Sequence, residues 1–445
     1  MMVMLVASMI RISAGCISGK LIERVQQLDN ACCGQSNDAV TVPWCIIPVG
    51  MTHQDAIWCC SCVPKLGQKE YQSMKNTLFY GFLLSGLLVA CGDQAVMDPE
   101  PGEPPALADF SALDEGWNRI EPGGETVCSD GSPYHFHVRP GDPEKLLFYL
   151  EGGGACWMGL NCDPGLQPSY QVNLGNTDPA RAHGIFAFDE PRNPFADYTV
   201  VMAPYCSGDV HLGDAEQTYE VPEVDERPAG EVHIRHRGWA NANTAMQWAF
   251  DHVYAPRELF VTGSSAGSIP SPFYAVKMAE QYADANVIQL GDASGGYRGF
   301  ANFNPYDVWE TDRVVAELSY INDIPGDQFS FQHLYIAAAQ ANPDITLASF
   351  DTIEDEVQLQ FLALGGMPAR SLRPLLEANL EEISGWVPDF RYYVSGGDYH
   401  TILLRPELYR NASNGVPLIE WLEQLAAGEP VPNVMCEDCA VVEQH

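Results

Sequence analysis

The amino-acid sequence predicts an α/β fold, with a mainly parallel central sheet flanked by helices. Short apolar runs recur at 145–151, 197–204, 258–263, 285–292, 344–351 and 390–396. Several are almost continuously apolar, as expected for strands buried on both faces. Helical segments lie between them, at 240–253, 271–284 and 329–342. This alternation is typical of a parallel sheet, whose functional groups gather at the carboxyl ends of the strands.

The charge balance of the chain is strongly acidic. Its 445 residues include 23 basic and 59 acidic side chains, for a net charge of −36 at pH 7, with an ordinary hydrophobic content of 46%. Such a surface repels nucleic acids and anionic lipid, so we expect no nucleic-acid partner. It also disfavours a polyanionic substrate unless the site carries its own positive charge.

Residues 74–90 show, in order, the features of a bacterial lipoprotein signal peptide. Lys75 forms the basic region, and 78–90 is an apolar stretch too short for a membrane span. The sequence "LVAC" at 88–91 then resembles a lipobox. We therefore expect export to a bacterial cell envelope, periplasmic or surface-exposed, with a lipid on Cys91 as the only membrane contact. The alternative is a short buried helix with a free cysteine.

The signal at residue 74 predicts that 1–73 is a non-native upstream extension. This stretch has seven cysteines and no clear periodicity, and the alternative is a small metal-binding or disulfide-bonded module. After the signal, the acidic and Pro-rich residues 91–109 are typical of an extended tether. One domain, 110–445, should follow, since no repeat or second linker interrupts it.

Six cysteines lie in this predicted domain, at 128, 156, 162, 206, 436 and 439. An even number in an exported protein predicts disulfides, with 15 possible pairings. Only two residues separate Cys436 from Cys439, so we expect a local disulfide there. Half of a metal site or a redox motif is the alternative, but no second ligand pair accompanies it. The sequence predicts no metal and no cofactor.

The sequence "GSSAG" at 263–267 matches G-x-S-x-G, with Ser265 in the nucleophile position. A predicted strand enters the motif and a helical segment leaves it, which is the context of an α/β-hydrolase-like fold. Glycines are needed on both sides because larger side chains would collide around the strained serine. We therefore predict Ser265 as a nucleophile that requires a base, an acid and an oxyanion site. The alternative is a Gly/Ser turn that caps the next helix.

The order Ser…Asp…His in such folds restricts the partners of Ser265. His400 is the predicted base because it follows the last predicted strand through the glycine-containing loop 396–400. Asp292 and Asp351 each end a strand after the serine. The position two strands after the nucleophile selects Asp351 as the acid. Asp292, followed by Ala-Ser-Gly-Gly, is expected to shape a loop beside the site.

The glycine-rich sequence "LEGGGACW" at 150–157 follows the first of the buried strands. Glycines allow backbone N–H groups to approach a ligand closely. We expect Gly153 and Gly154 to donate to an oxyanion together with Ala266, the residue after the nucleophile. Phosphate binding is the alternative, but the sequence lacks the lysine and the glycine spacing of phosphate-binding loops.

Several stretches together resemble the pectin acetylesterase/Notum family of serine carboxylesterases. They span about 128–400 and read "CSDGSPYHFHV", "LLFYLEGGGACW", "PYCSGDVHLG", "HRGWANANTAMQW", "GSSAGS", "GDASGGY", "SFD" and "GGDYH". The resemblance implies an α/β-hydrolase-like fold and a catalytic triad of Ser265, Asp351 and His400. It places the oxyanion donors on Gly153, Gly154 and Ala266, and it implies the pairs Cys156–Cys162 and Cys128–Cys206.

Two positions depart from the family pattern. Gly154 stands where the family commonly has an aromatic residue, which implies a smaller or reshaped pocket wall. Ser268 replaces the second of two glycines after the nucleophile. Neither change alters the groups expected to perform chemistry, so both bear on the substrate.

The resemblance implies a serine carboxylesterase that hydrolyses O-acyl esters through an acyl-enzyme, with O-acetyl groups on carbohydrate as the expected substrate. The net charge of −36 argues against polygalacturonate, so neutral acylated glycans or small esters are expected equally. We expect a monomer. The alternatives are a lipase-like or other acyl hydrolase of the same fold, a peptidase, and a non-catalytic glycan-binding surface lipoprotein.

Overall fold

The computed structural model describes residues 109–439 apart from 176 and 226, together with 443–444 and two short strands in the first hundred residues. These strands, β1 (Ala39–Thr41) and β2 (Cys62–Pro64), pair antiparallel. The predicted upstream extension, the signal peptide with Cys91, and almost all of the tether lie outside the described residues. Everything below concerns the unit formed by residues 101–445.

A nine-stranded sheet runs through the described part of this unit, in the order β15-β12-β11-β10-β9-β5-β6-β4-β3. All neighbours from β15 to β6 pair parallel, whereas β4 and β3 are antiparallel additions at one edge. The mainly parallel sheet predicted from the sequence is therefore confirmed. The strands are β3 (Asn118–Ile120), β4 (Phe136–Arg139), β5 (Asp142–Leu150), β6 (Tyr198–Ala203), β9 (Glu258–Ser264), β10 (Asn286–Asp292), β11 (Thr346–Thr352), β12 (Arg391–Ser395) and β15 (Val434–Met435).

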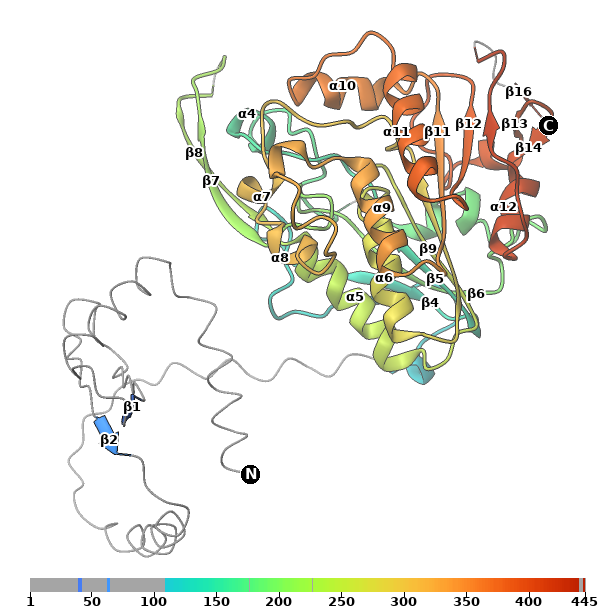
Figure 1. Cartoon of the computed structure of the whole chain (residues 1–445), viewed down its shortest axis with the longest axis horizontal. Helices are drawn as coiled ribbons and strands as arrows, with labels where there is room; N and C mark the ends of the chain where they lie inside the picture. The colour runs from blue at the N-terminus through green and yellow to red at the C-terminus, as the bar shows by residue number, and fades with distance from the viewer. Residues whose placement is uncertain are drawn as a thin grey trace, which may run out of the picture. The chain divides into compact units, whose positions relative to one another are not determined.

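Helices cover both faces of the sheet, because the central strands are apolar on both sides. Side chains along β5 alternate between two cores: Phe148 and Leu150 lie in one and Tyr149 in the other. On the first face, visible in Figure 1, the covering helices are α5 (Gly238–His252), α6 (Ser271–Gln281), α9 (Phe331–Ala341) and α11 (Arg373–Trp386). The second face is covered by α12 (Leu418–Ala426) with the short helices η4 (Gly184–Phe186) and η7 (Pro406–Tyr409).

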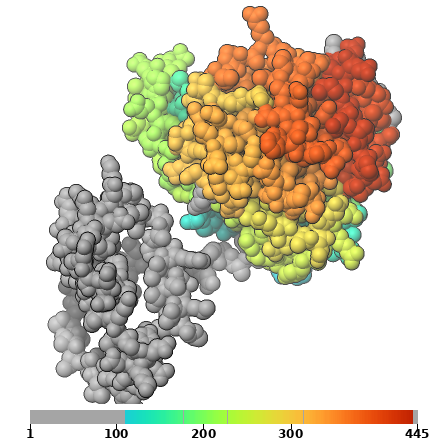
Figure 2. Space-filling view, in the orientation of Figure 1, coloured from blue at the N-terminus to red at the C-terminus, as the bar shows by residue number. Residues whose placement is uncertain are grey.

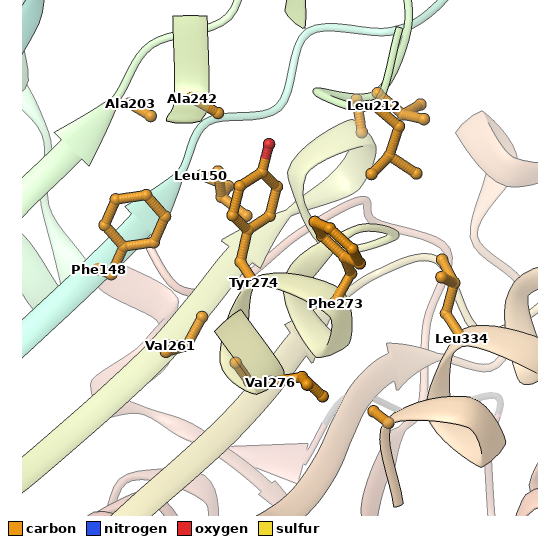
Figure 3. Packing of buried hydrophobic residues seen from close by; sticks show 14 of the residues in the cluster. Phe148, Leu150, Ala203, Leu212, Ala242, Val261, Phe273, Tyr274, Val276 and Leu334 are labelled. Atoms are coloured by element: carbon orange, nitrogen blue, oxygen red, sulfur yellow. The ribbon is translucent and has the colours of Figure 1, made fainter. Parts of the chain in front are cut away.

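The helix that follows the predicted nucleophile turn is packed tightly onto the sheet. Figure 3 shows Tyr274 of α6 beside Phe148 of β5 and Val261 of β9, with Phe273 between Tyr274 and Leu334. The rings of Phe148 and Tyr274 have centroids 5.9 Å apart. All five side chains are 0% exposed, so this packing fixes the turn between β9 and α6 on a rigid base.

The remaining elements are shorter or peripheral. A polar hairpin, β7 and β8, extends from the body of the domain, as Figure 2 shows in light green. The bounds are β7 (Ala215–Val221), β8 (Gly230–His236), α4 (Gly159–Cys162), α7 (Pro305–Val308), α8 (Asp312–Val315), α10 (Glu356–Leu364), β13 (Asn411–Ser413), β14 (Val416–Pro417), β16 (Glu443–Gln444), η2 (Phe110–Ala112), η3 (Pro179–Arg181), η5 (Ser265–Gly267) and η6 (Gly326–Gln328).

Three disulfides join the six cysteines of the domain. Cys128 pairs with Cys206, Cys156 with Cys162, and Cys436 with Cys439. The local disulfide expected at the C-terminus is confirmed, and so are the two pairs implied by the family resemblance. In the described residues, no helix has the length and apolar character needed to cross a membrane.

Candidate active site

Ser265 lies at a sharp turn where β9 ends and the chain enters η5. Its φ of 54° is in the left-handed region, which is unfavourable for a residue with a side chain. Glycines make room for this turn. A Cβ on Gly263 would overlap with the carbonyl oxygen of Gly267, and a Cβ on Gly267 would overlap with that of Leu150. The collision expected from the sequence therefore exists, and Ser265 has the geometry of a nucleophile elbow.

Side-chain hydrogen bonds brace the turn on both sides of Ser265. The hydroxyl of Ser264 donates to Asp292 over 2.7 Å and accepts from the hydroxyl of Tyr149 over 3.0 Å. Ser268, the residue that departs from the family pattern, is fully buried, and its Oγ lies 2.6 Å from Oγ of Ser294. The serine at this position thus links the nucleophile turn to the loop after β10.

His400 follows β12 in a loop and lines the same cavity as Ser265. Nδ1 of the imidazole lies 2.5 Å from a carboxylate oxygen of Asp355. Nε2 is buried and has no hydrogen-bond partner among the described residues. A histidine held by a carboxylate at one nitrogen, with the other nitrogen free, is the arrangement of a general base in a serine hydrolase.

Asp355 is built into the start of α10, where it is the N-terminal capping residue. Its Oδ1 accepts the backbone N–H groups of Val357 and Gln358, at 2.9 and 3.1 Å. Its Oδ2 accepts from the side-chain amide of Gln358 as well as facing His400. The side chain is 0% exposed, so these donors and the helix N-terminus stabilise a carboxylate that water does not reach.

The structure corrects the expected acid: Asp355, not Asp351, is the partner of His400. Asp351 lies within β11, where it pairs in register with Val394 of β12. Its Oδ1 accepts from the N–H of Gly295 and the amide of Gln358, and its Oδ2 is buried without a partner among the described residues. Asp351 lies inside β11, whereas Asp355 lies between the end of β11 and the start of α10. The contact with His400 is made from this connecting segment.

Asp351 is a buried acid whose ionisation is disfavoured by burial and by the nearby carboxyl group of Asp355. Burial raises the pKa of Asp351 to about 8, against the opposite effects of the Gly295 N–H and the Gln358 amide. The neighbouring carboxylates of Asp355 and Asp292 raise this pKa further. With a pKa of about 8, Asp351 is mainly protonated at pH 7, and the side-chain amide of Gln358 donates to the carboxyl groups of both Asp351 and Asp355.

Asp292 has the loop-shaping position that the sequence predicts. It is fully buried and accepts the backbone N–H groups of Ile402 and Leu403, at 3.0 Å each, in addition to the hydroxyl of Ser264. One carboxyl group thus connects the nucleophile turn to the two residues that follow the loop of His400. Burial raises its pKa, opposed by these hydrogen bonds.

The glycine-rich segment after β5 comes to the same cavity. Gly153 and Gly154 line it together with Ser265. The carbonyl of Gly153 accepts from Gln171, and the N–H of Ala155 donates to Ser169. In contrast, the N–H groups of Gly153 and Gly154 have no backbone acceptor within the described residues. Their role as oxyanion donors with Ala266 stays a prediction.

Two cavities meet at Ser265. The first, about 60 Å³, is lined mainly by apolar and aromatic side chains: Trp157, Val210, Ile269, Tyr297, Phe300, Phe303, Trp309, Phe329, Phe331 and Phe361. Gly154 and Ala266 complete it beside the serine. The aromatic wall absent at Gly154 is supplied by Trp157, whose ring stacks on Phe303 with centroids 4.3 Å apart.

The second cavity is wider, more open and polar, with a volume of about 480 Å³. Ser265 and His400 line it together with Glu151, Ser169 and Thr401. Glu151, Asp355 and Gln358 are the site residues that reasoning from the sequence missed. An aspartate directly before the helical stretch "EVQLQFLAL" was an available signal for Asp355, because Asp is favoured as a helix N-cap.

One cluster among the described residues has the composition of a metal site: Cys156, Cys162 and His236. Both cysteines are in a disulfide. Nδ1 of His236 lies 2.8 Å from the carbonyl oxygen of Ser207, and Nε2 lies 2.8 Å from the hydroxyl of Tyr219. These side chains are already engaged, so the cluster offers no free ligand set for a cation.

The fold and the turn at Ser265 define an α/β-hydrolase-like protein. Residues 121–315 match the sequence model of the pectinacetylesterase family. The chain is also similar to palmitoleoyl-protein carboxylesterase NOTUM of Schmidtea mediterranea, with 33% identity over 92 residues. That match covers 19% of this chain and 18% of the NOTUM protein.

These comparisons confirm the predicted resemblance to this family. The chain spans less than a fifth of its curated relative's length. The family match ends at residue 315, before Asp355 and His400. The assignment of those two side chains therefore depends on the geometry described above.

Proposed function

We propose that the protein is a serine esterase in which Ser265 is the nucleophile, His400 the general base and Asp355 the acid that orients it. The observation that carries this proposal is the cavity that Ser265 and His400 share. In addition, Nδ1 of His400 contacts the fully buried carboxyl group of Asp355. The strained backbone of Ser265 supports it, because such strain is concentrated at functional sites.

The reaction follows from these roles. Nε2 of His400 takes the proton of the Ser265 hydroxyl as its oxygen bonds to the ester carbonyl carbon, whose π electrons move to the oxygen. The N–H groups of Gly153, Gly154 and Ala266 stabilise that oxyanion. On collapse, the alcohol leaves with the proton from His400, and an acyl-serine remains. Water then attacks with the same base, releasing the carboxylic acid and restoring the serine.

The apolar cavity is proposed to hold the acyl group. The volume of this cavity is about 60 Å³, and one water molecule needs about 10–15 Å³ when volume is measured in the same way. The cavity therefore accepts roughly four to six groups of that size, more than an acetyl group provides. With the carbonyl carbon added to these four to six groups, we propose an acyl chain of about five to seven carbons, longer than the acetyl group that the family resemblance implies.

The polar cavity is proposed to receive the alcohol. Ser169 and Thr401 are polar residues of its lining, and Phe361 adds an aromatic one. A wide, open cavity with hydrogen-bonding groups suits a sugar rather than a bare alkyl alcohol. This supports an acylated carbohydrate as substrate, as the family resemblance implies.

A labelling experiment tests the catalytic proposal. A fluorophosphonate probe should label the wild-type domain, and Ser265→Ala should abolish both the labelling and the hydrolysis of p-nitrophenyl esters. A series from acetate to palmitate should give its highest kcat/KM between butyrate and octanoate. A folded domain that is neither labelled nor active would favour the non-catalytic glycan-binding protein, and an optimum at palmitate would favour a lipase.

We also propose that the enzyme is exported and held at the cell envelope by a lipid on Cys91. Three disulfides in the domain support an oxidising compartment. The mass of the mature N-terminus tests this proposal. A lipidated Cys91 supports it, and a peptide from residues 1–73 in the mature protein would contradict it.

A further inference from the structure

Gln358 is a buried amide that connects the two carboxyl groups of Asp351 and Asp355. It is the third residue of α10 and is 0% exposed. Its side-chain nitrogen donates to Oδ1 of Asp351 and to Oδ2 of Asp355, at 3.1 Å each. Its Oε1 accepts the backbone N–H of Gly296 over 2.8 Å. The reaction proposed above assigns no role to this amide.

The orientation of the Gln358 amide follows from its neighbours. A primary amide has two N–H donors and a carbonyl acceptor. The N–H of Gly296 is a donor only, so it must face the carbonyl oxygen, and the NH2 group then faces the two carboxyl groups. The opposite orientation would place one N–H against another. Both donors and the acceptor of the buried amide are therefore used, and each has a defined partner.

Gln358 does more than stabilise the start of its own helix. A glutamine at the third helical position commonly accepts the backbone N–H of the capping residue. The Oε1 of Gln358 accepts instead from Gly296, in the loop after β10. The helix start is served by Oδ1 of the cap, Asp355, which accepts the N–H groups of Val357 and Gln358. The side-chain amide is directed at the other oxygen, Oδ2, which contacts His400.

The amide restricts the directions from which Oδ2 of Asp355 can accept a hydrogen bond. This oxygen has two lone pairs, and it faces two donors, the amide of Gln358 and Nδ1 of His400. With the amide in place, one direction is left, and the imidazole occupies it. The acid of a catalytic triad must hold the imidazole in one tautomer and one orientation, so an acid that could turn freely would support the base poorly.

We propose that Gln358 is a positioning residue of the esterase, whose amide fixes the carboxyl group of Asp355 in the orientation that holds His400. Its remaining hydrogen bonds, to Asp351 and Gly296, anchor the amide to β11 and to the loop after β10. This inference rests on the proposed esterase function and adds support for its base. Gln358 is not among the described residues that line either cavity, so it should affect the chemical step and leave substrate binding nearly unchanged.

Several titratable groups surround this amide, so a charge placed there would be felt at once. Asp351 lies on β11, Asp355 at the start of α10, and His400 after β12. Burial raises the pKa of Asp351 to about 8 and also raises that of Asp292, at the end of β10. Burial raises the pKa of Tyr297 well above 10, so this phenol is neutral near pH 7. A neutral amide can donate to both neighbouring acids without adding to their repulsion.

Gln358→Glu tests the role through its pH dependence. The new carboxyl group has nearly the shape of the amide and, while protonated, keeps one donor for Asp355. Asp351 is itself mainly protonated at pH 6 and no longer requires a donor. Once ionised, the new group loses its donor and repels Asp355.

Burial and the two acids raise the pKa of this new carboxyl group, which titrates as a coupled pair with Asp351. We expect kcat/KM on p-nitrophenyl butyrate to stay within about threefold of the wild type at pH 6 and to fall to about a tenth of it at pH 8.5. The ratio to the wild type at each pH cancels the titration of His400 that both proteins share.

Gln358→Met and Gln360→Glu complete the comparison. Gln358→Met removes both donors at every pH, so kcat should fall about 10- to 100-fold, independently of pH, with KM changed by less than about twofold. Gln360 is exposed on the same helix, two residues further on. Gln360→Glu adds the same charge without reaching the two acids, so its ratio to the wild type should stay near one. The rate of fluorophosphonate labelling per folded molecule gives a second measure of each ratio.

The outcomes separate this inference from the proposed function. With an active wild type, a flat ratio near one for Gln358→Glu, or a wild-type kcat in Gln358→Met, would overturn the role of Gln358 and leave the esterase intact. If neither variant folds, NMR of the wild type decides. The side-chain N–H protons of Gln358 should shift as His400 titrates, and protons that do not respond contradict the proposal. A folded wild type with no turnover and no fluorophosphonate labelling would overturn both.

Discussion

The carboxylate of Asp355 lies 2.5 Å from Nδ1 of His400, across 45 residues of sequence. The carboxylate is 0% exposed and the imidazole is 14% exposed, so water screens this contact little. It joins the first turn of α10 to the loop after β12. Backbone hydrogen bonds from Glu354 to Gly397 and from Glu356 to Asp398 hold the same two segments together.

The contact predicts opposite results for two aspartates. Asp355→Asn should lower kcat about 10³- to 10⁴-fold, since an amide neither fixes the tautomer of His400 nor stabilises its charged form. Asp351→Asn should leave kcat nearly unchanged at pH 7, because Asp351 is already neutral there. Kinetics on p-nitrophenyl butyrate measure both. A large loss in Asp351→Asn with normal activity in Asp355→Asn would restore the acid expected from the sequence.

Asp351 should also make the folded domain less stable as the pH rises. Its pKa is about 8 in the folded state and ordinary, near 3.8, when unfolded. Between these values the folded chain keeps a proton that the unfolded chain has released, so the free energy of unfolding falls with increasing pH. At about 1.4 kcal/mol per pH unit, the loss between pH 4 and pH 8 is on the order of 5 kcal/mol.

Urea unfolding of the wild type and Asp351→Asn at pH 5, 6, 7 and 8 measures this effect. Buried acids that do not interact with Asp351 contribute equally to both proteins, so the difference between them reports on Asp351 and on its coupling to Asp292 and Asp355. We expect Asp351→Asn to gain stability relative to the wild type at each step. Parallel profiles would show that Asp351 ionises normally in the folded protein.

Asp292→Ala should loosen the loop of His400. The substitution leaves the N–H groups of Ile402 and Leu403 and the hydroxyl of Ser264 without their acceptor, at about 1–3 kcal/mol for each buried donor. We expect kcat to fall about 10- to 100-fold, since a displaced His400 takes the proton of Ser265 less efficiently. Hydrogen exchange of the amides at 399–404 should accelerate.

The matched control for that loop is Asp398→Ala, an exposed acid two residues before His400. It should change neither kcat nor hydrogen exchange appreciably. If Asp292→Ala behaves like Asp398→Ala, the buried carboxyl does not position the base.

Gly267→Ala should disrupt the nucleophile turn. The added methyl group would overlap with the backbone carbonyl of Leu150, which lies in the central sheet and cannot move at small cost. We expect loss of fluorophosphonate labelling and a lower melting temperature. Gly385→Ala in α11 is the control: its methyl group meets open space, and the domain should gain about 0.5–1 kcal/mol. Normal labelling of Gly267→Ala would contradict the elbow geometry.

The sequence by itself determined the elements that local patterns encode. The six predicted strands form consecutive members of the sheet because each is a buried apolar run with its own turn signals. The turn at Ser265 was readable because glycines at 263 and 267 are a steric requirement of that local geometry. The disulfide between Cys436 and Cys439 could also be predicted from the local sequence, because the two cysteines are close together along the chain.

The choice of acid was decided by the tertiary structure. Asp351 and Asp355 are four residues apart. The sequence shows only that Asp351 ends a predicted strand and that Asp355 comes shortly after it. Whether a carboxylate reaches His400 depends on where β11 ends and on the direction in which α10 leaves the sheet. Those are properties of packing between segments, so a pattern along one segment does not contain them.

The two cavities at Ser265 were likewise outside the reach of the sequence. Their walls come from the segments after β5, β6, β9, β10 and β12, from the start of α9 and from α10, and each apolar side chain among them resembles an ordinary core residue when it is taken alone. The shape and charge of the site arise only when these segments pack together. The sequence thus determined the turn at Ser265, while the fold decided which carboxyl group contacts His400 and which side chains line the two cavities.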